Sequence, residues 1–169
     1  MIKNFLIYDT ETTGTDFNKN EIIKISCIKV INDTEEELLL YFLPNKPLTS
    51  EVEKLTGITN TFLNNKGDNL NNIKKLILFL NDLPIICYAA AFEKKFLEKL
   101  ITSYTDANIK LSWVDLVEIN RFKNKNLRFN LDELALKAGY ELNINKKDPL
   151  AYCRKILMTY IYLSKLKSS

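Results

Sequence analysis

Residues 5–17 read FLIYDTETTGTDF, an apolar run that ends in two acids. Asp9 and Glu11 are two positions apart, and side chains at i and i+2 of a β-strand point to the same face. Two carboxylates held that close raise each other's pKa unless a cation lies between them. Carboxylate oxygens are the ligands that Mg²⁺ and Mn²⁺ prefer. The stretch therefore predicts a buried strand whose end binds a divalent metal ion.

The rest of the chain alternates between strand and helix patterns. Apolar runs bounded by turn residues predict five strands, at 4–10, 21–31, 37–43, 84–89 and 111–116. Apolar spacing and capping residues predict helices at 50–56, 70–80, 91–101, 130–139 and 148–163. Three strands in succession, then alternating helices and strands, predict an α/β fold. Its mixed sheet is an antiparallel meander with parallel additions, flanked by helices. The 169 residues suit a single domain, 1–169.

Charge and composition narrow the chemistry. The chain contains no histidine, so the commonest general base and zinc ligand are absent. Residues 119–169 carry 11 Lys and Arg against 4 acids. A basic third beside an acidic pair fits a polyanion held over a metal site, but charge alone favours the alternative of solvated helix faces.

The cellular setting follows from features that the sequence lacks. No apolar run approaches the roughly 18 residues that span a bilayer. Acids interrupt the first apolar segment, which does not resemble a secretory signal. We therefore expect a cytoplasmic protein without membrane contact. Its three cysteines, Cys27, Cys87 and Cys153, are expected to be free thiols in the core.

Several segments, in order, resemble one family. The segments are DTETTG (9–14), LTGITN (55–60), AAAFEKKFL (89–97) and FNLDELALKAGYEL (129–142), followed by Asp148. They resemble the motifs of the DEDD-type 3′–5′ exonucleases, the superfamily of bacterial proofreading subunits. The resemblance covers nearly the whole chain and implies a ribonuclease-H-like fold.

The resemblance also implies which residues are catalytic. Asp9, Glu11, Glu93 and Asp148 would converge to hold two Mg²⁺ or Mn²⁺ ions at the scissile phosphate, where one activates water and the other stabilises the leaving oxygen. Taken alone, Glu93 fits a solvated position on an amphipathic helix. Asp148 alone fits a helix N-cap before Pro149.

Five further residues are candidates for binding the terminal nucleotide. The resemblance implies that Thr12, Thr13 and Gly14 contact it, although Thr-Thr-Gly also suits a simple turn. Tyr88 and Phe92 are candidates for stacking on a base, and core packing is at least as good an explanation for Phe92.

The sequence departs from the family pattern in the second and third motifs. Ala89 stands where the family has Asn, and Glu93 stands where it has Asp. A ligand displaced by about 1 Å can lower a rate roughly a hundredfold. Asn143 and Ile144 stand where the two branches of the family carry His and Tyr, respectively. Losing a general base costs roughly 10²–10⁴-fold in rate.

Two hypotheses follow. The first is a slow, metal-dependent 3′–5′ exonuclease acting on single-stranded DNA ends, with RNA as an alternative substrate and a polymerase as a candidate partner. The second is a catalytically impaired domain that binds nucleic acid or a polymerase subunit without cutting. The four retained acids favour the first hypothesis, and the substitutions favour the second.

Overall fold

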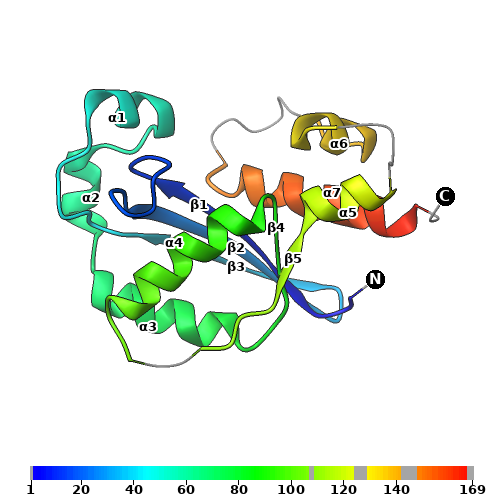
Figure 1. Cartoon of the computed structure of the whole chain (residues 1–169), viewed down its shortest axis with the longest axis horizontal. Helices are drawn as coiled ribbons and strands as arrows, with labels where there is room; N and C mark the ends of the chain where they lie inside the picture. The colour runs from blue at the N-terminus through cyan, green and yellow to red at the C-terminus, as the bar shows by residue number, and fades with distance from the viewer. Residues whose placement is uncertain (1, 107–108, 124–128, 142–147, 167–169) are drawn as a thin grey trace.

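The computed structural model describes residues 2–106, 109–123, 129–141 and 148–166 (Figure 1). Its strands form one sheet in the order β3-β2-β1-β4-β5. The strands are β1 (Phe5–Thr12), β2 (Ile22–Ile31), β3 (Thr34–Tyr41), β4 (Ile85–Cys87) and β5 (Trp113–Asp115). β1, β2 and β3 pair antiparallel, whereas β4 runs parallel to β1 and to β5. The predicted mixed five-stranded sheet is confirmed.

Helices cover both faces of this sheet (Figure 1). They are α1 (Ser50–Thr56), α2 (Asn60–Lys66), α3 (Asn69–Leu80), α4 (Ala90–Thr102), α5 (Leu116–Lys123), α6 (Leu131–Lys137) and α7 (Ala151–Lys165). Two of these helices, α2 and α5, were not predicted from the sequence. α2 lies in an Asn-rich tract and buries only Leu63, so its apolar signal is weak. α5 follows β5 without a break, and its first residue, Leu116, falls within the predicted strand 111–116.

The apolar run of β1 reflects burial on both sides of the sheet. Leu6 and Tyr8 pack with α3 and α4, whereas Phe5 and Ile7 pack with α5, α6 and α7. A strand covered by helices on both faces reads as a continuous apolar run rather than as an alternating one. By the same alternation, Asp9 continues the face that carries Phe5 and Ile7. The first acid of the pair thus points toward the side of α7.

The start of the last helix differs from the prediction. α7 begins at Ala151, not at Asp148. The Asp148 carboxylate accepts a hydrogen bond from the Leu150 N–H at 2.9 Å, and its carbonyl accepts one from Ala151 N–H at 3.1 Å. The side chain thus closes a tight turn that precedes the helix. Asp148 is therefore neither the first helical residue nor the N-cap.

Two smaller expectations concern membranes and thiols. No helix in the described ranges is both long and apolar enough to cross a bilayer. The three cysteines are free and buried, as predicted. Cys153 on α7 donates to the Ser26 carbonyl of β2 at 3.1 Å, which ties the helix to the strand beside β1.

Candidate active site

Asp9 is a buried carboxylate at the centre of the sheet. Its residue is only 7% exposed. Burial and then the nearby Glu11 raise the pKa of Asp9 to about 7, although Lys24 and Lys155 act in the opposite direction. A carboxylate in this position is costly to ionise without a neighbouring cation.

Glu93 approaches Asp9 from the first turn of α4. It is 5% exposed, and its Oε2 accepts a hydrogen bond from Thr10 Oγ1 at 2.7 Å. Burial, followed by the charge of Asp9, raises the pKa of Glu93 to about 8. The alternative of a solvated surface glutamate is wrong, because the fold places this side chain against the strand that carries Asp9.

The entry into α4 is fixed by a residue that the sequence analysis missed. Asp115, the last residue of β5, accepts hydrogen bonds from the N–H groups of Ala89 and Ala90 at 3.2 and 2.9 Å. Ala89 has a φ of +66° and offers no side-chain cap. Asp115 therefore supplies the cap that Ala89 lacks, and so orients the turn that bears Glu93. A signal existed, since Asp115 follows apolar residues in the predicted strand 111–116, as Asp9 follows the apolar run FLIY.

Lys24 is a second residue that sequence reasoning overlooked. It lies directly opposite Glu11 in the ladder between β1 and β2, and its Nζ is 3.7 Å from Glu11 Oε1. The lysine side chain is 13% exposed, against 38% for Glu11. Sequence alone did not give the register that pairs them, because the turn between the strands is long.

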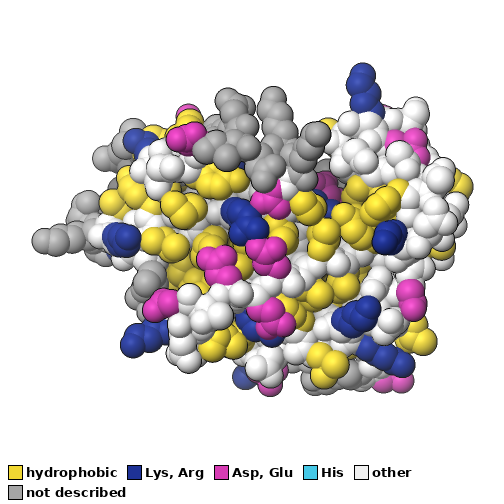
Figure 2. Space-filling model, turned by 180° about the vertical axis from the view of Figure 1, so that it is seen from behind, with side chains coloured by type: hydrophobic (Ala, Val, Ile, Leu, Met, Phe, Trp, Pro, Cys, Tyr) yellow, Lys and Arg dark blue, Asp and Glu magenta, His cyan; other side chains and the backbone are white. Residues whose placement is uncertain are grey.

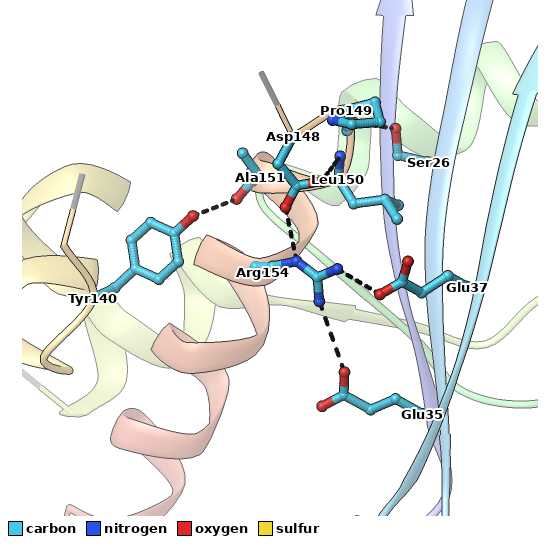
Figure 3. A network of polar contacts seen from close by, with 9 residues as sticks. All are labelled: Ser26, Glu35, Glu37, Tyr140, Asp148, Pro149, Leu150, Ala151 and Arg154. Atoms are coloured by element: carbon cyan, nitrogen blue, oxygen red, sulfur yellow. Dashed lines mark hydrogen bonds and ion pairs between the residues drawn. The ribbon is translucent and has the colours of Figure 1, made fainter. Parts of the chain in front are cut away.

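Asp148 lies in a network with Arg154 of α7 (Figure 3). Its Oδ2 accepts from Arg154 Nε at 2.8 Å. The guanidinium also reaches Glu37 and lies 3.9 Å from Glu35, both on β3. Burial alone would raise the pKa of Asp148, but the Leu150 N–H and Arg154 outweigh it and lower the pKa below its ordinary value. Asp148 is thus held as a carboxylate chiefly by the Leu150 N–H and Arg154, with a smaller contribution from Lys24.

The acids form two groups rather than one ready-made metal cage. Asp9, Glu11 and Glu93 influence one another electrostatically, whereas Asp148 faces Arg154. Over the described parts of the chain, no three Asp, Glu or Cys side chains surround a common point as a metal site requires. The donors nevertheless suit a hard divalent cation, because two of them are buried carboxylates that need a positive partner.

The Thr-Thr-Gly segment forms a self-contained turn. Thr12 Oγ1 donates to the Gly14 carbonyl at 2.7 Å, and Thr13 Oγ1 accepts from Glu21 N–H at 3.0 Å. A Cβ on Gly14 would come within 2.7 Å of the Asn20 side chain, which would have to move. The turn interpretation accounts for these contacts, and nucleotide binding by the three residues stays a prediction.

The two aromatic candidates lie on opposite faces of the sheet. Phe92 packs with the α3 and α4 side, with its ring 4.7 Å from that of Phe96, whereas Tyr88 packs with the α7 side. Both are partly buried. Packing explains Phe92, and base stacking by either residue is untested.

The third-motif positions Asn143 and Ile144 lie outside the described residues. On the face opposite to that of Figure 1, Lys and Arg side chains lie scattered among acidic and apolar ones (Figure 2). This distribution agrees with solvated surfaces on that face.

Comparison with known proteins places these features in a family. The exonuclease family model of the RNase T type matches residues 6–145, a range that includes three of the four acids and stops before Asp148. DNA polymerase III PolC-type of Halalkalibacterium halodurans is 29% identical over 140 residues, which cover 82% of this chain and 10% of that protein. DNA polymerase III subunit epsilon of Buchnera aphidicola is 25% identical over 146 residues, covering 80% of this chain and 63% of the relative.

The fold has a counterpart among solved structures. Exonuclease I of E. coli, in complex with a dA16 oligonucleotide, superposes with a TM-score of 0.75 at 18% identity. The alignment covers 97% of this chain and 41% of the exonuclease. The chain thus spans less than two thirds of the length of each of these proteins. By its family match and its fold, the chain belongs to the RNase T exonuclease family, within the DEDD group of ribonuclease-H-like proteins.

Proposed function

We propose that this chain is a divalent-metal-dependent 3′–5′ exonuclease that acts on single-stranded DNA ends, with RNA as a secondary substrate. The observation that carries the proposal is the buried hydrogen bond between Glu93 and Thr10, which brings two distant motifs together within electrostatic reach of Asp9. Support for the substrate comes from the E. coli relative, whose structure holds a DNA oligonucleotide. Support for a polymerase partner comes from two relatives, a DNA polymerase III PolC-type and a DNA polymerase III subunit epsilon.

Asp9, Glu11, Glu93 and Asp148 are the residues that would hold Mg²⁺ or Mn²⁺. Such an ion, when bound, lowers the pKa of a water molecule and neutralises charge on the phosphate. Asp9 and Glu93 supply buried oxygens, Thr10 fixes one oxygen of Glu93, and Glu11 lies at the more exposed edge. A pair of ions, as the family resemblance implies, also requires Asp148, whose two oxygens already accept hydrogen bonds.

The rate is expected to be low. The chain has no histidine to take the proton of the attacking water, and a missing general base costs roughly 10²–10⁴-fold. Thr12, Thr13 and Gly14, with Tyr88 and Phe92, are proposed to line the position of the terminal nucleotide.

One structural relationship favours the alternative, a domain that binds nucleic acid or a polymerase without cutting. Arg154 binds the carboxylate of Asp148 and is itself held by Glu37 of β3. If this network persists when nucleic acid binds, Asp148 is not available to hold a metal ion at the scissile phosphate. The protein would then retain the fold and the pocket but not the full catalytic set.

A cleavage assay separates the two functions. A 3′-labelled single-stranded oligonucleotide is incubated with the protein and Mn²⁺, in parallel with Asp9→Ala and Glu93→Gln variants. Release of labelled mononucleotide by the wild type, but not by Asp9→Ala or Glu93→Gln, supports the exonuclease. Glu98→Gln is the matched control, because Glu98 lies on the same helix but is solvent-exposed and pairs only loosely, at 3.8 Å, with Lys94. Wild-type release no greater than that of Asp9→Ala would contradict the exonuclease and favour the binding role.

A further inference from the structure

Lys24 is a cation built into the carboxylate site. Its Nζ lies 3.7 Å from Glu11 Oε1, across the ladder between β1 and β2. The same ammonium acts electrostatically on Asp9 and on Asp148. With 13% of its side chain exposed, Lys24 is held by the strand rather than free in solvent. Lys24 is thus paired with Glu11, and its charge also acts on Asp9 and Asp148.

Both carboxylate oxygens of Asp148 already accept hydrogen bonds. One of its oxygens accepts from the Leu150 N–H and the other from Arg154 Nε, at 2.9 and 2.8 Å. Figure 3 shows Arg154 reaching from α7 between Asp148 and the two β3 glutamates, Glu35 and Glu37. A metal ion would have to displace a charge-assisted hydrogen bond to recruit Asp148, and such bonds are about twice as strong as neutral ones.

The net charge of the remaining groups in the site matches the charge of one divalent ion. Asp9, Glu11 and Glu93, when ionised, carry three negative charges, and Lys24 offsets one of them. Lys155 also acts on Asp9, but Asp132 pairs with it at 2.5 Å. A net charge of minus two is balanced by a single Mg²⁺ or Mn²⁺. A second ion would enter a pocket that already contains an ammonium group and would be repelled by it.

We propose that this site binds one divalent ion, and that the Lys24 ammonium takes the place of the second by holding Glu11 and offsetting the negative charge of the pocket. Lys24 is in this sense a positioning residue, acting through Glu11. The proposal rests on the exonuclease function proposed above, and it narrows the two-ion arrangement that the family resemblance implies.

The test is the stoichiometry and affinity of Mn²⁺ binding, measured by isothermal titration calorimetry on the full chain without nucleic acid. The wild type is expected to bind one ion per chain. Lys24→Met removes the ammonium and keeps an apolar stem of similar length, so the affinity for Mn²⁺ should rise about tenfold or more, since a nearby positive charge no longer opposes the ion. Lys24→Arg keeps the charge and should bind one ion with nearly wild-type affinity.

Lys29→Met is the matched control. Lys29 lies on the same strand, is equally buried with 12% of its side chain exposed, and pairs with a β3 glutamate, Glu36, at 2.8 Å. Its side chain lies over the ring of Phe79, on the opposite face of the sheet from Lys24. Its removal should leave Mn²⁺ binding unchanged. Circular dichroism confirms that each variant is folded before titration.

Two results would overturn the inference: two ions of comparable affinity on the wild type, or equal Mn²⁺ affinity in Lys24→Met and the wild type. The first requires only the wild-type protein, so it stands even if Lys24→Met fails to fold. A chain that cuts DNA with two ions bound refutes the inference and keeps the exonuclease. A chain that binds one ion and cuts nothing supports the inference and refutes the exonuclease.

Discussion

The hydroxyl of Thr10 donates to Glu93 Oε2 at 2.7 Å, joining two residues that are 83 positions apart in the sequence. Both residues are buried. This hydrogen bond links the end of β1 to the first turn of α4, and it fixes the orientation of a carboxylate on which the charge of Asp9 acts.

Thr10→Val tests this link. The substitution keeps the shape of the side chain but leaves the buried Glu93 carboxylate without its donor, which should cost about 1–3 kcal/mol of unfolding free energy. Urea denaturation at pH 8.5 without metal measures it. Thr159→Val is the control, because the Thr159 hydroxyl is buried and finds no hydrogen-bond partner among the described residues. That change should be neutral or slightly stabilising, and equal losses in both variants would contradict the role given to Thr10.

The stability of the metal-free protein should fall as pH rises through neutrality. Burial raises the pKa of Asp9 from 3.8 to about 7 and that of Glu93 from 4.5 to about 8. The folded chain therefore keeps protons that the unfolded chain has already released above about pH 5. This stabilisation is complete below the unfolded values and is lost as pH passes through the folded ones. Between pH 5.5 and 8.5 the loss should be about 2–5 kcal/mol.

Thermal unfolding in EDTA across that range measures this loss. Few other groups titrate in this window, because the chain contains no histidine. The Asp9→Asn/Glu93→Gln double variant should remove most of the slope, and Mn²⁺ should reduce it in the wild type by stabilising the ionised acids. A wild-type slope unchanged in the double variant would show that other groups are responsible.

Ala89→Asn should stabilise the protein. Ala89 adopts a φ of +66° at the entry to α4, a conformation that costs an L-residue roughly 1–2 kcal/mol and that Asn tolerates better. We expect a gain of about 0.5–1 kcal/mol. Ala91→Asn, at an exposed position inside the same helix, should instead lose about 0.5 kcal/mol through lower helix propensity. Equal effects at the two positions would argue against strain at Ala89.

Asp115→Ala should impair both stability and metal binding. It removes the acceptor for the N–H groups of Ala89, Ala90 and Val117, and loss of a cap costs about 1–2 kcal/mol. Because α4 carries Glu93, the affinity of the protein for Mn²⁺ should also fall. Asp68→Ala removes the cap of α3 and should cost similar stability without weakening metal binding. Unaltered Mn²⁺ affinity in Asp115→Ala would show that the cap does not position Glu93.

The element order and the sheet were predictable from sequence because the apolar runs are strong and well separated. FLIY, IIKISCIKVI and PIIC are buried on at least one face, and their lengths fit strands rather than helices. The short helices α2 and α5 were missed because α2 buries one residue and α5 continues directly from a strand. Local patterns identify an element when it buries a recognisable face or carries clear capping residues, as α1 does between Thr49 and Gly57.

Sequence alone determined that Asp9 and Glu11 share one face of a strand, because side-chain direction in a strand follows from chain position. It also excluded histidine chemistry. Only the tertiary structure decided which charges those acids meet. Strand register set Lys24 against Glu11, the β5 end brought Asp115 to α4, and α7 turned Arg154 toward Asp148. Such partners depend on register and helix packing between segments far apart in the chain, which no local pattern encodes.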